Sequence, residues 1–470
     1  MSSLKKIDRG LIERYGKEAF MYVEYPHKRF WDRRPSDGDY RLELKKLLSN
    51  APEHPMMLYV HIPFCHKQCL FCTCHVDITL DYSRVTKYLD YLHTEIDFLA
   101  EFFSTHGFSP NFHGVHLGGG SPTYPKELEF DRLVKRLSTI VDIASLDEFA
   151  IEIDPRRVKP HQMKYYRDHG INRISFGIQD FDLRVQKAVD RVQPRKLIER
   201  LLTPAIRDMF PNGVNFDIIC GLPKQTQETF LSTMSEVVRM LPDRVCVNYM
   251  HMSSHFHPHQ LRMPADAIPD RFTRKEMFTV AAKILLANGY VRTGYDHFVR
   301  HSDPVAIALQ NGYMGWNRLG VTTGRYDSTI GIGVSSTSTV GDRFYCQNYY
   351  DISDYMSAID CGEFPIELSY SLSDEDLLRR SVIQRLRNYF SVEKAEVETE
   401  FGIDFDVHFH REIIALSDYV TNGLVLIEDD RITINEIGWQ FANLIASIFD
   451  IYIAQPKEPE TNNESLFVLI

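Results

Sequence analysis

The chain has 470 residues, 44% of them apolar and 25% charged, so it is long enough for two or three domains with sizeable cores. Its formal net charge of −11 argues against a broad nucleic-acid surface and against a polybasic membrane patch. Its apolar runs are too short to span a bilayer, and its first residues are unlike a secretory signal. Eight cysteines are too few for a disulfide framework, so we expect a cytoplasmic protein with metal or redox chemistry.

Residues 1–55 are mixed in pattern and rich in tyrosine, and we interpret them as an extension packed on the main domain. In residues 56–370, short apolar runs alternate with helical patterns, which predicts an α/β fold with a parallel sheet under helical cover. Six or more such units predict a partial TIM-like barrel with its chemistry at the carboxyl ends of the strands. The expected strands are 57–62, 113–118, 148–153, 172–178, 214–220, 244–250 and 290–295. The expected helices are 83–103, 127–140, 160–169, 195–209, 227–240 and 274–288.

The pattern changes near residue 371, and we assign residues 371–470 to a separate C-terminal module. Ser373 is expected to cap its first helix, because acidic residues follow directly. Three helices and a hairpin predict a winged-helix-like module. Since no helix is basic, a lid or substrate-docking role is favoured over DNA binding. The expected helices are 374–388, 392–400, 407–421 and 435–449, the hairpin is 424–434, and the polar tail 455–464 is expected to be loose.

Three cysteines with C-x3-C-x2-C spacing, Cys65, Cys69 and Cys72, follow the apolar run 56–62. Three thiolates can hold three irons of a [4Fe–4S] cube and leave the fourth iron for S-adenosylmethionine. Electron transfer into the sulfonium group then yields a 5′-deoxyadenosyl radical, which is the chemistry of radical S-adenosylmethionine (radical SAM) enzymes. A zinc site is the alternative, because Cys74 offers a fourth thiolate. Four cysteines crowded into one short loop favour the cluster.

A run of three glycines, 118–120, follows the next expected strand. Glycines allow a backbone to approach a ligand closely, although an isolated run more often marks a turn. Because this run lies one strand–helix unit beyond the cysteine loop, we favour a role in holding the methionine end of the cosubstrate.

Polar residues interrupt the apolar pattern at the ends of several expected strands, where each needs a partner. Their equivalent positions predict a barrel mouth lined for a ligand. They are Glu152, Asp154, Gln179, Asp180 and Asp217. Arg191 offers a cation for a carboxylate, although a lone arginine in a helical pattern is more often at the surface. A dense group of histidines fits either a metal or tetrapyrrole site or a loop surface; it comprises His251, His255, His257 and His259.

With these residues in place, the chain resembles the oxygen-independent coproporphyrinogen III dehydrogenases, a radical SAM family of haem biosynthesis. The resemblance covers nearly the whole chain. It rests on the segments 22–26, 59–67, 221–226 and 296–298 and on Cys74.

The resemblance implies a [4Fe–4S] cluster on the three cysteines, and two bound S-adenosylmethionine molecules. The first would be contacted by Tyr59, Gly119 and Glu152. The second would lie near Phe71, Gly120, Ser121, Gln179, Arg191, Asp217 and Met250, and Thr337 would also belong to the cosubstrate-binding region. The implied reaction removes hydrogen from a propionate and releases carbon dioxide and an electron to leave a vinyl group, twice per porphyrinogen. Tyr59 and His61 match positions that the family needs for activity.

The chain also departs from the family pattern. Thr73 replaces a glycine, Arg318 and Leu319 stand where the family has a Phe-Gln pair, and Thr337 replaces an isoleucine. These changes leave open a relative that acts on another tetrapyrrole or transfers a methyl group. A haem-binding carrier without turnover is a third reading, which Cys74 argues against.

The resemblance also implies partners. The tetrapyrrole substrate is a tetra-anion, so Arg156, Arg157 and Arg318 are expected near its carboxylates. We expect an external electron donor of the flavodoxin or ferredoxin type, no nucleic-acid partner and a monomer.

Overall fold

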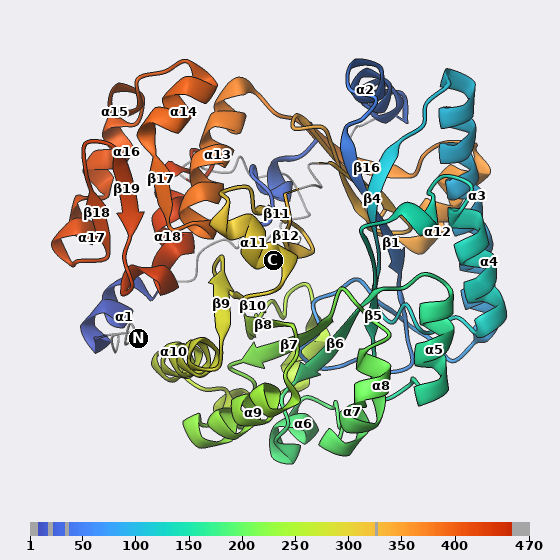
Figure 1. Cartoon of the computed structure of the whole chain (residues 1–470), viewed down its shortest axis with the longest axis horizontal. Helices are drawn as coiled ribbons and strands as arrows, with labels where there is room; N and C mark the ends of the chain where they lie inside the picture. The colour runs from blue at the N-terminus through green and yellow to red at the C-terminus, as the bar shows by residue number, and fades with distance from the viewer. Residues whose placement is uncertain (1–7, 17–21, 33–36, 325–327, 454–470) are drawn as a thin grey trace.

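A twelve-stranded mixed sheet organises the molecule, a computed structural model that describes residues 8–16, 22–32, 37–324 and 328–453 (Figure 1). The strand order is β16-β15-β14-β13-β1-β4-β5-β6-β7-β8-β10-β9. Its central strands run parallel, which confirms the predicted partial barrel. These strands are β1 (Pro55–Ile62), β4 (Asn111–Gly119), β5 (Glu148–Ile153), β6 (Arg173–Gln179), β7 (Val214–Cys220) and β8 (Arg244–Tyr249).

Helices cover the outer face of the parallel strands, as the alternating pattern predicts (Figure 1). They are α3 (Tyr82–His106), α4 (Glu127–Leu137), α5 (Pro160–Asp168), α6 (Leu183–Ala188), α7 (Arg195–Leu201), α8 (Pro204–Arg207), α9 (Gln227–Met240) and α10 (Arg271–Ala287). The single helix expected at 195–209 is wrong, because the chain breaks between α7 and α8. Pro204 has no backbone N–H to continue a helix, and Thr203 instead accepts a hydrogen bond from the Ile206 N–H as the cap of α8.

Both edges of the sheet differ from the sequence-based expectation. β13 (Ser328–Ile332) pairs in parallel with β1, and three antiparallel strands extend that edge. These are β14 (Thr337–Val340), β15 (Phe344–Asn348) and β16 (Ile366–Ser371). At the other edge, β9 (Tyr290–Thr293) pairs antiparallel with β10 (His297–Arg300), so the seventh expected strand is not part of the parallel series. The reason is the short turn at Gly294, a glycine with a φ of 75°, which reverses the direction of the chain. A neighbouring parallel strand would instead need a long crossover connection.

Further elements before residue 371 lie around the sheet (Figure 1). They are α2 (Asp37–Asn50), the two-stranded ribbon of β11 (Gly315–Asn317) and β12 (Gly320–Thr322), α11 (Pro304–Gln310) and α12 (Ile352–Asp360).

The first helix expected after residue 371 forms at the predicted residues. Ser373 accepts a hydrogen bond from the Asp376 N–H at 3.1 Å and caps α13 (Asp374–Asn388). The rest of the module is more broken than expected, and the hairpin gains a third strand. Its elements are β17 (Ser391–Glu393), α14 (Lys394–Phe401), α15 (Phe405–His408), α16 (His410–Ala415), α17 (Ser417–Thr421), β18 (Val425–Ile427), β19 (Arg431–Ile434) and α18 (Ala442–Ala446).

The N-terminal residues pack against this module as well as against the sheet. The hydroxyl of Tyr15 in α1 (Arg9–Tyr15) donates to Asp418 at 2.6 Å, and that of Tyr22 donates to Asp450 at 3.0 Å. Asp32 exchanges backbone hydrogen bonds with Ser369 at the edge of the sheet. The tail 455–464 lies outside the described residues. None of the helices described is long and apolar enough to cross a membrane. The division of the chain at residues 55 and 370 stays a prediction.

Candidate active site

A cavity of about 590 Å³ opens at the carboxyl ends of the parallel strands and reaches into the barrel. Most of the residues singled out from the sequence line it: Cys65, Cys69, Phe71, Cys72, Gly119, Gly120, Glu152, Gln179, Arg191, Asp217 and Met250. Of the residues expected to hold the cluster or the cosubstrate or to serve catalysis, four lie outside its lining, namely Tyr59, His61, Ser121 and Thr337. The cavity therefore joins groups that come from the ends of many different strands.

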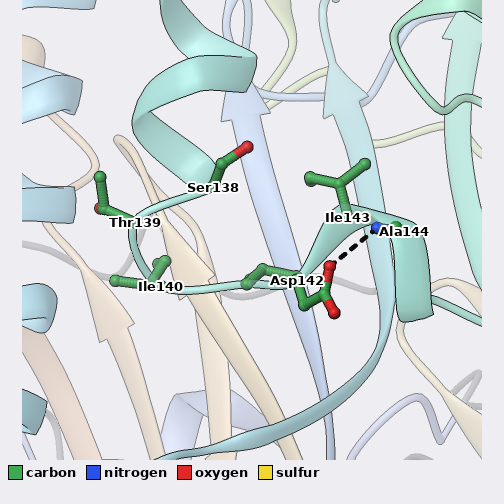
Figure 2. A pocket seen from close by; sticks show the side chains of 7 residues that line it. Ser138, Thr139, Ile140, Asp142, Ile143 and Ala144 are labelled. Atoms are coloured by element: carbon green, nitrogen blue, oxygen red, sulfur yellow. Dashed lines mark hydrogen bonds between the residues drawn. The ribbon is translucent and has the colours of Figure 1, made fainter.

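A second hollow, of about 550 Å³, lies on the turn between α4 and β5 (Figure 2). Its one carboxylate, Asp142, accepts a hydrogen bond from the Ala144 N–H at 3.1 Å and so serves as a local cap. With no other ionisable group in its lining, this hollow offers little for catalysis.

The cysteine loop begins two residues after β1 and is closed by a short parallel pair, β2 (Phe64–Cys65) with β3 (Asp77–Ile78). Cys69 is buried, and Arg156 and Arg191 point donors at its sulfur, at 3.6 and 3.4 Å. Burial, with the neighbouring Cys72 and Cys69, raises the pKa of the Cys65 thiol to about 12. Two guanidinium groups beside an anionic iron–sulfur cluster would offset the cost of ionising these buried thiols. Hydrogen bonds to sulfur also tune the reduction potential of a cluster.

The spacing of the loop thiols fits a cluster better than a single ion. Within the described part of the chain, the only group of three candidate ligand atoms mutually within 4.8 Å lies elsewhere, at Cys246, Asp296 and His297. Four thiolates around one zinc ion would lie closer together than this limit, because each Zn–S bond is about 2.3 Å long. The residues present therefore fit a [4Fe–4S] cube and not the zinc alternative.

The glycine run at the end of β4 lies directly against the cysteine loop. A Cβ atom on Gly120 would lie 2.5 Å from the Pro63 carbonyl oxygen, and one on Gly119 would lie 2.9 Å from the His61 ring. Gly119 also has a φ of 115°, which side-chain-bearing residues rarely adopt. Glycine is thus required here to bring the backbone of β4 next to the cavity.

Tyr59 and His61 form a hydrogen-bonded pair behind the cavity. The Nε2 atom of His61 lies 3.1 Å from the His75 carbonyl, which can only accept, so Nε2 carries the proton. The Nδ1 atom then accepts from the Tyr59 hydroxyl at 3.0 Å. Burial, and secondarily the nearby His75, lowers the pKa of His61 to about 3, so the ring is neutral. His61 therefore fixes the position of Tyr59.

Glu152 is oriented by a chain of donors from the interior of the barrel. Arg173 donates to Nδ1 of His116 at 3.4 Å, and Nε2 of His116 donates to Glu152 at 3.2 Å. The Tyr59 ring stacks on His116 with centroids 6.0 Å apart. The carboxylate of Glu152 remains partly open to the cavity, where it can accept a hydrogen bond from a ligand.

The other strand-end residues divide between the cavity and the scaffold. Gln179 has a φ of 64° and a buried Oε1 atom without a hydrogen-bond partner, as expected of a group that awaits a ligand. Arg191 donates to the Gly177 carbonyl at 2.9 Å. Asp180, in contrast, accepts from Gln225 and Thr233 and belongs to the scaffold.

Asp217 and Met250 complete the wall near Gln179. Asn215 and Ser175 donate to Asp217 at 2.9 and 3.1 Å, and burial raises the pKa of this carboxyl group. Met250 packs with Leu70 of the cysteine loop in a small apolar cluster. The wall thus combines a hydrogen-bonded carboxyl group with an apolar contact to the loop.

The arginines expected near the substrate have other partners. Arg156 forms an ion pair with Asp154 at 2.7 Å. Burial opposes ionisation of Asp154, but the hydrogen bonds from Arg156 and the charges of Arg191 and Arg156 together outweigh it and lower the pKa of Asp154 to about 2. Arg318 lines the cavity but pairs with the buried Glu24 at 3.2 Å, and Arg157 lies at the surface. None of the three therefore presents an uncompensated charge to the cavity.

The histidine group packs on the cysteine loop. Nε2 of His259 donates to the Cys72 carbonyl at 2.8 Å, and Gln260 donates to the Phe71 carbonyl at 3.2 Å. No three groups of this segment converge as metal ligands within the described residues. His259 therefore supports the loop, His251 lines the cavity, and the described residues of this segment form no separate metal site.

The far end of the cavity contains residues that sequence reasoning did not single out as functional: Cys246, Asp296, His297 and Trp316. Asp296 and His297 were named only as part of the 296–298 segment that contributes to the family resemblance. Each is a single residue in an ordinary strand or turn, and only the fold brings them together.

Comparisons with known proteins agree with this geometry. Residues 59–237 match the Radical SAM superfamily, and residues 372–441 match the HemN C-terminal domain. The chain is 36% identical over 449 residues to the oxygen-independent coproporphyrinogen III oxidase of Pseudomonas aeruginosa, with 95% of this chain and 96% of the relative covered. It is 32% identical to the Escherichia coli protein of that name, at the same coverage. The solved structure of coproporphyrinogen III oxidase from Escherichia coli superposes with a TM-score of 0.87 at 30% identity, covering 95% of this chain and 99% of that one.

Fold, cysteine loop and glycine run define a radical SAM oxidoreductase. Within that class, the chain belongs to the oxygen-independent coproporphyrinogen III oxidase family, which confirms the resemblance seen in the sequence. Membership implies a [4Fe–4S] cluster and S-adenosylmethionine, and the thiols and glycines described above fit both.

Proposed function

We propose that this protein converts coproporphyrinogen III to protoporphyrinogen IX by oxidative decarboxylation of two propionate side chains in haem biosynthesis. One observation carries the proposal: a single cavity of about 590 Å³ connects the three loop thiols with a deep polar end. That volume is in the range of sites for ligands of this size, roughly 300–1,000 Å³. Relatives at 32–36% identity bear the name of this activity.

In this proposal Cys65, Cys69 and Cys72 hold the cluster, which with S-adenosylmethionine supplies a 5′-deoxyadenosyl radical when reduced. The first cosubstrate lies against Gly119 and Glu152. His116 keeps the carboxylate of Glu152 turned toward the ligand. His61 acts through Tyr59, because its ring nitrogens are both engaged and it does not line the cavity.

We also propose the second cosubstrate site along the wall formed by Phe71, Gly120, Gln179, Arg191, Asp217 and Met250, all of which line the cavity. Among the described residues, Arg191 forms no ion pair with a carboxylate, so its charge is available to a ligand carboxylate. Ser121 and Thr337 lie outside the lining, and we assign them no contact.

The electron donor that we propose is a small protein of the flavodoxin or ferredoxin type, acting on a monomer. An external donor must approach the cysteine loop, where the side chains of Lys67 and Cys74 are exposed. Lys67 pairs with Asp190 at 2.6 Å across the loop.

Anaerobically reconstituted, reduced protein tests the function when it is given coproporphyrinogen III and S-adenosylmethionine. We expect a divinyl product and 5′-deoxyadenosine, and neither from the Cys65→Ala variant. 5′-Deoxyadenosine without vinyl product would overturn the substrate assignment and favour another tetrapyrrole. Haem binding without cosubstrate cleavage would leave only a carrier. Equilibrium binding of labelled S-adenosylmethionine reports whether one or two molecules bind per chain.

A further inference from the structure

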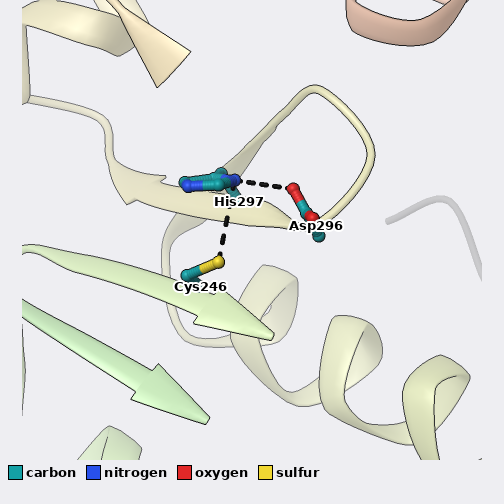
Figure 3. A group of neighbouring side chains, drawn as sticks. All are labelled: Cys246, Asp296 and His297. Atoms are coloured by element: carbon teal, nitrogen blue, oxygen red, sulfur yellow. Dashed lines mark hydrogen bonds and ion pairs between the residues drawn. The ribbon is translucent and has the colours of Figure 1, made fainter. Parts of the chain in front are cut away.

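A cysteine, an aspartate and a histidine meet at the far end of the cavity (Figure 3). Cys246 lies in β8, His297 begins β10, and Asp296 precedes it in the turn after β9. Cys246 and His297 are paired residues of the antiparallel β8–β10 ladder, so their side chains project from the same face. The Nδ1 atom of His297 is 2.6 Å from Asp296 Oδ1 and 3.8 Å from Cys246 Sγ.

Cys246 and Asp296 are buried and His297 is partly buried, and all three are accessible from the cavity. Cys246 and Asp296 are 5% and 2% exposed, and all three residues line the cavity wall. Their candidate ligand atoms all lie within 4.8 Å of one another, a property that no other group of three in the described residues shares. The three thiols of the cysteine loop are not within this distance of one another.

The charges around this end favour a bound cation. Asp217 and Asp296 both face Cys246, and Glu152 lies next to Asp217. The nearby cation is Arg387, a fully buried guanidinium stacked on Trp316 at 3.7 Å.

The two arginines deeper in the barrel do not change this balance. Arg173 pairs with Glu148 at 2.9 Å, and Arg244 pairs with Asp303 at 2.7 Å. This end of the cavity therefore holds more carboxyl groups than cations, which is an unfavourable arrangement in a low-dielectric interior without a counter-charge.

We propose that Cys246, Asp296 and His297 bind a divalent transition-metal ion of the zinc class. Thiolate, imidazole and carboxylate are the donors that zinc accepts, whereas magnesium and calcium prefer oxygen alone. Three protein ligands leave the fourth tetrahedral position free, as in catalytic zinc sites. Because all three ligands line the cavity, that position faces it. The ligands of this site are separate from those of the cluster, so its metal content can be measured whether or not the proposed reaction takes place.

The alternative is a hydrogen-bonded triad without a metal, in which His297 donates from Nδ1 to Asp296. In that state burial, together with Asp296 and Asp217, raises the pKa of the Cys246 thiol well above its usual range. A metal ion reverses this effect, because it holds the thiolate directly. The two states thus differ in whether sulfur is bonded to a metal.

The test uses the cluster-loaded full chain, equilibrated with Zn²⁺ and then passed over a weak chelator. We expect about one zinc ion per chain by mass spectrometry, and one sulfur with nitrogen or oxygen ligands by zinc K-edge X-ray absorption. Cys246→Ala and His297→Ala should each lower the retained zinc roughly tenfold. Cys220→Ala is the matched control, because this buried cysteine of the neighbouring strand β7 points to the Arg274 carbonyl and away from the cavity.

Iron content per chain, measured on the same samples, reports whether each variant still folds around its cluster. Wild-type protein that retains no zinc would overturn the proposal, as would equal retention by Cys246→Ala. A zinc shell of sulfur alone, or of nitrogen and oxygen alone, would also overturn it. If Cys246→Ala loses iron as well, the absorption spectrum of the wild-type protein decides alone.

Discussion

The two ends of the cavity are built in different ways. At the cluster end, the ligands come from one short loop, Cys65 to Cys72, which the neighbouring β2–β3 pair closes and which distant residues such as His259 support. At the far end, Cys246, Asp296 and Arg318 come from segments far apart in the chain, and Arg318 pairs with Glu24. The ligand set of the first end is therefore contained in neighbouring residues, whereas that of the second is assembled only by tertiary packing.

The largest expected effect tests the locality of the cluster end. Cys65→Ala should abolish iron binding and turnover, because one cluster iron loses its only protein ligand. Cys74→Ala should leave iron content nearly unchanged, since its exposed thiol lies outside the three-cysteine set. Iron analysis and visible absorption after anaerobic reconstitution check both. Loss of iron from the Cys74 variant would contradict the three-ligand assignment.

The next effect concerns the far end, where a long-range ion pair closes the wall. Arg318→Met leaves the buried carboxylate of Glu24 without its partner and should lower the free energy of unfolding by about 3 kcal/mol. The double variant Glu24→Gln/Arg318→Met should recover most of this loss. Anaerobic urea titrations measure both values.

An exposed pair provides the control for this experiment. Arg132 and Asp90 are 3.3 Å apart, with side chains 53% and 63% exposed, so Arg132→Met should change stability little. If the losses in free energy of unfolding from the Glu24 and Arg318 substitutions simply add in the double variant, the ion pair does not stabilise the far end. The two ends of the cavity would then not differ as described.

The smallest expected effect is the pH dependence of stability that His61, behind the cluster end of the cavity, produces. The pKa of His61 is about 3 in the folded protein and about 6.5 in the unfolded chain, so only the unfolded chain takes up a proton between these values. His61 therefore contributes its full stability above pH 6.5 or so and loses it as pH falls toward about 3. Between about pH 7 and about pH 5 the wild type should lose about 2 kcal/mol more than His61→Asn.

Urea titrations at the two pH values measure this difference. The exposed His301→Gln is the control and should keep the wild-type pH dependence. An equal slope for wild type and His61→Asn would show that the ring is not held neutral in the fold.

Most of the parallel sheet could be predicted from the sequence, because each strand is a short apolar run followed by a helical pattern. The edges could not. The 290–295 run is as apolar as the others, yet Gly294 turns it into an antiparallel edge pair. Likewise β13 lies beside β1 in the sheet although some 270 residues separate them, and no local pattern carries that information.

The residues of the candidate site also fall into those that a local sequence pattern marks and those that only the fold brings together. Cys65, Gly120 and Glu152 could be found because spacing and strand ends mark them. Arg318 was expected to offer a free charge, but its partner Glu24 lies in the N-terminal segment and could not be identified from spacing. Cys246 carries no local signal, since it is one apolar-pattern residue of an ordinary strand.

The segment 22–32 has a consequence for biosynthesis. It contributes Val23 to the cavity wall and Glu24 to the Arg318 pair, and it is anchored by Gln347, Ser369 and Asp450. A ribosome makes these anchors 319 to 428 residues after the segment itself, so the segment must wait for them before it can settle. The cysteine loop, in contrast, is closed by strands made soon after it. A nascent chain can therefore shape its metal-binding loop while the wall opposite is still absent.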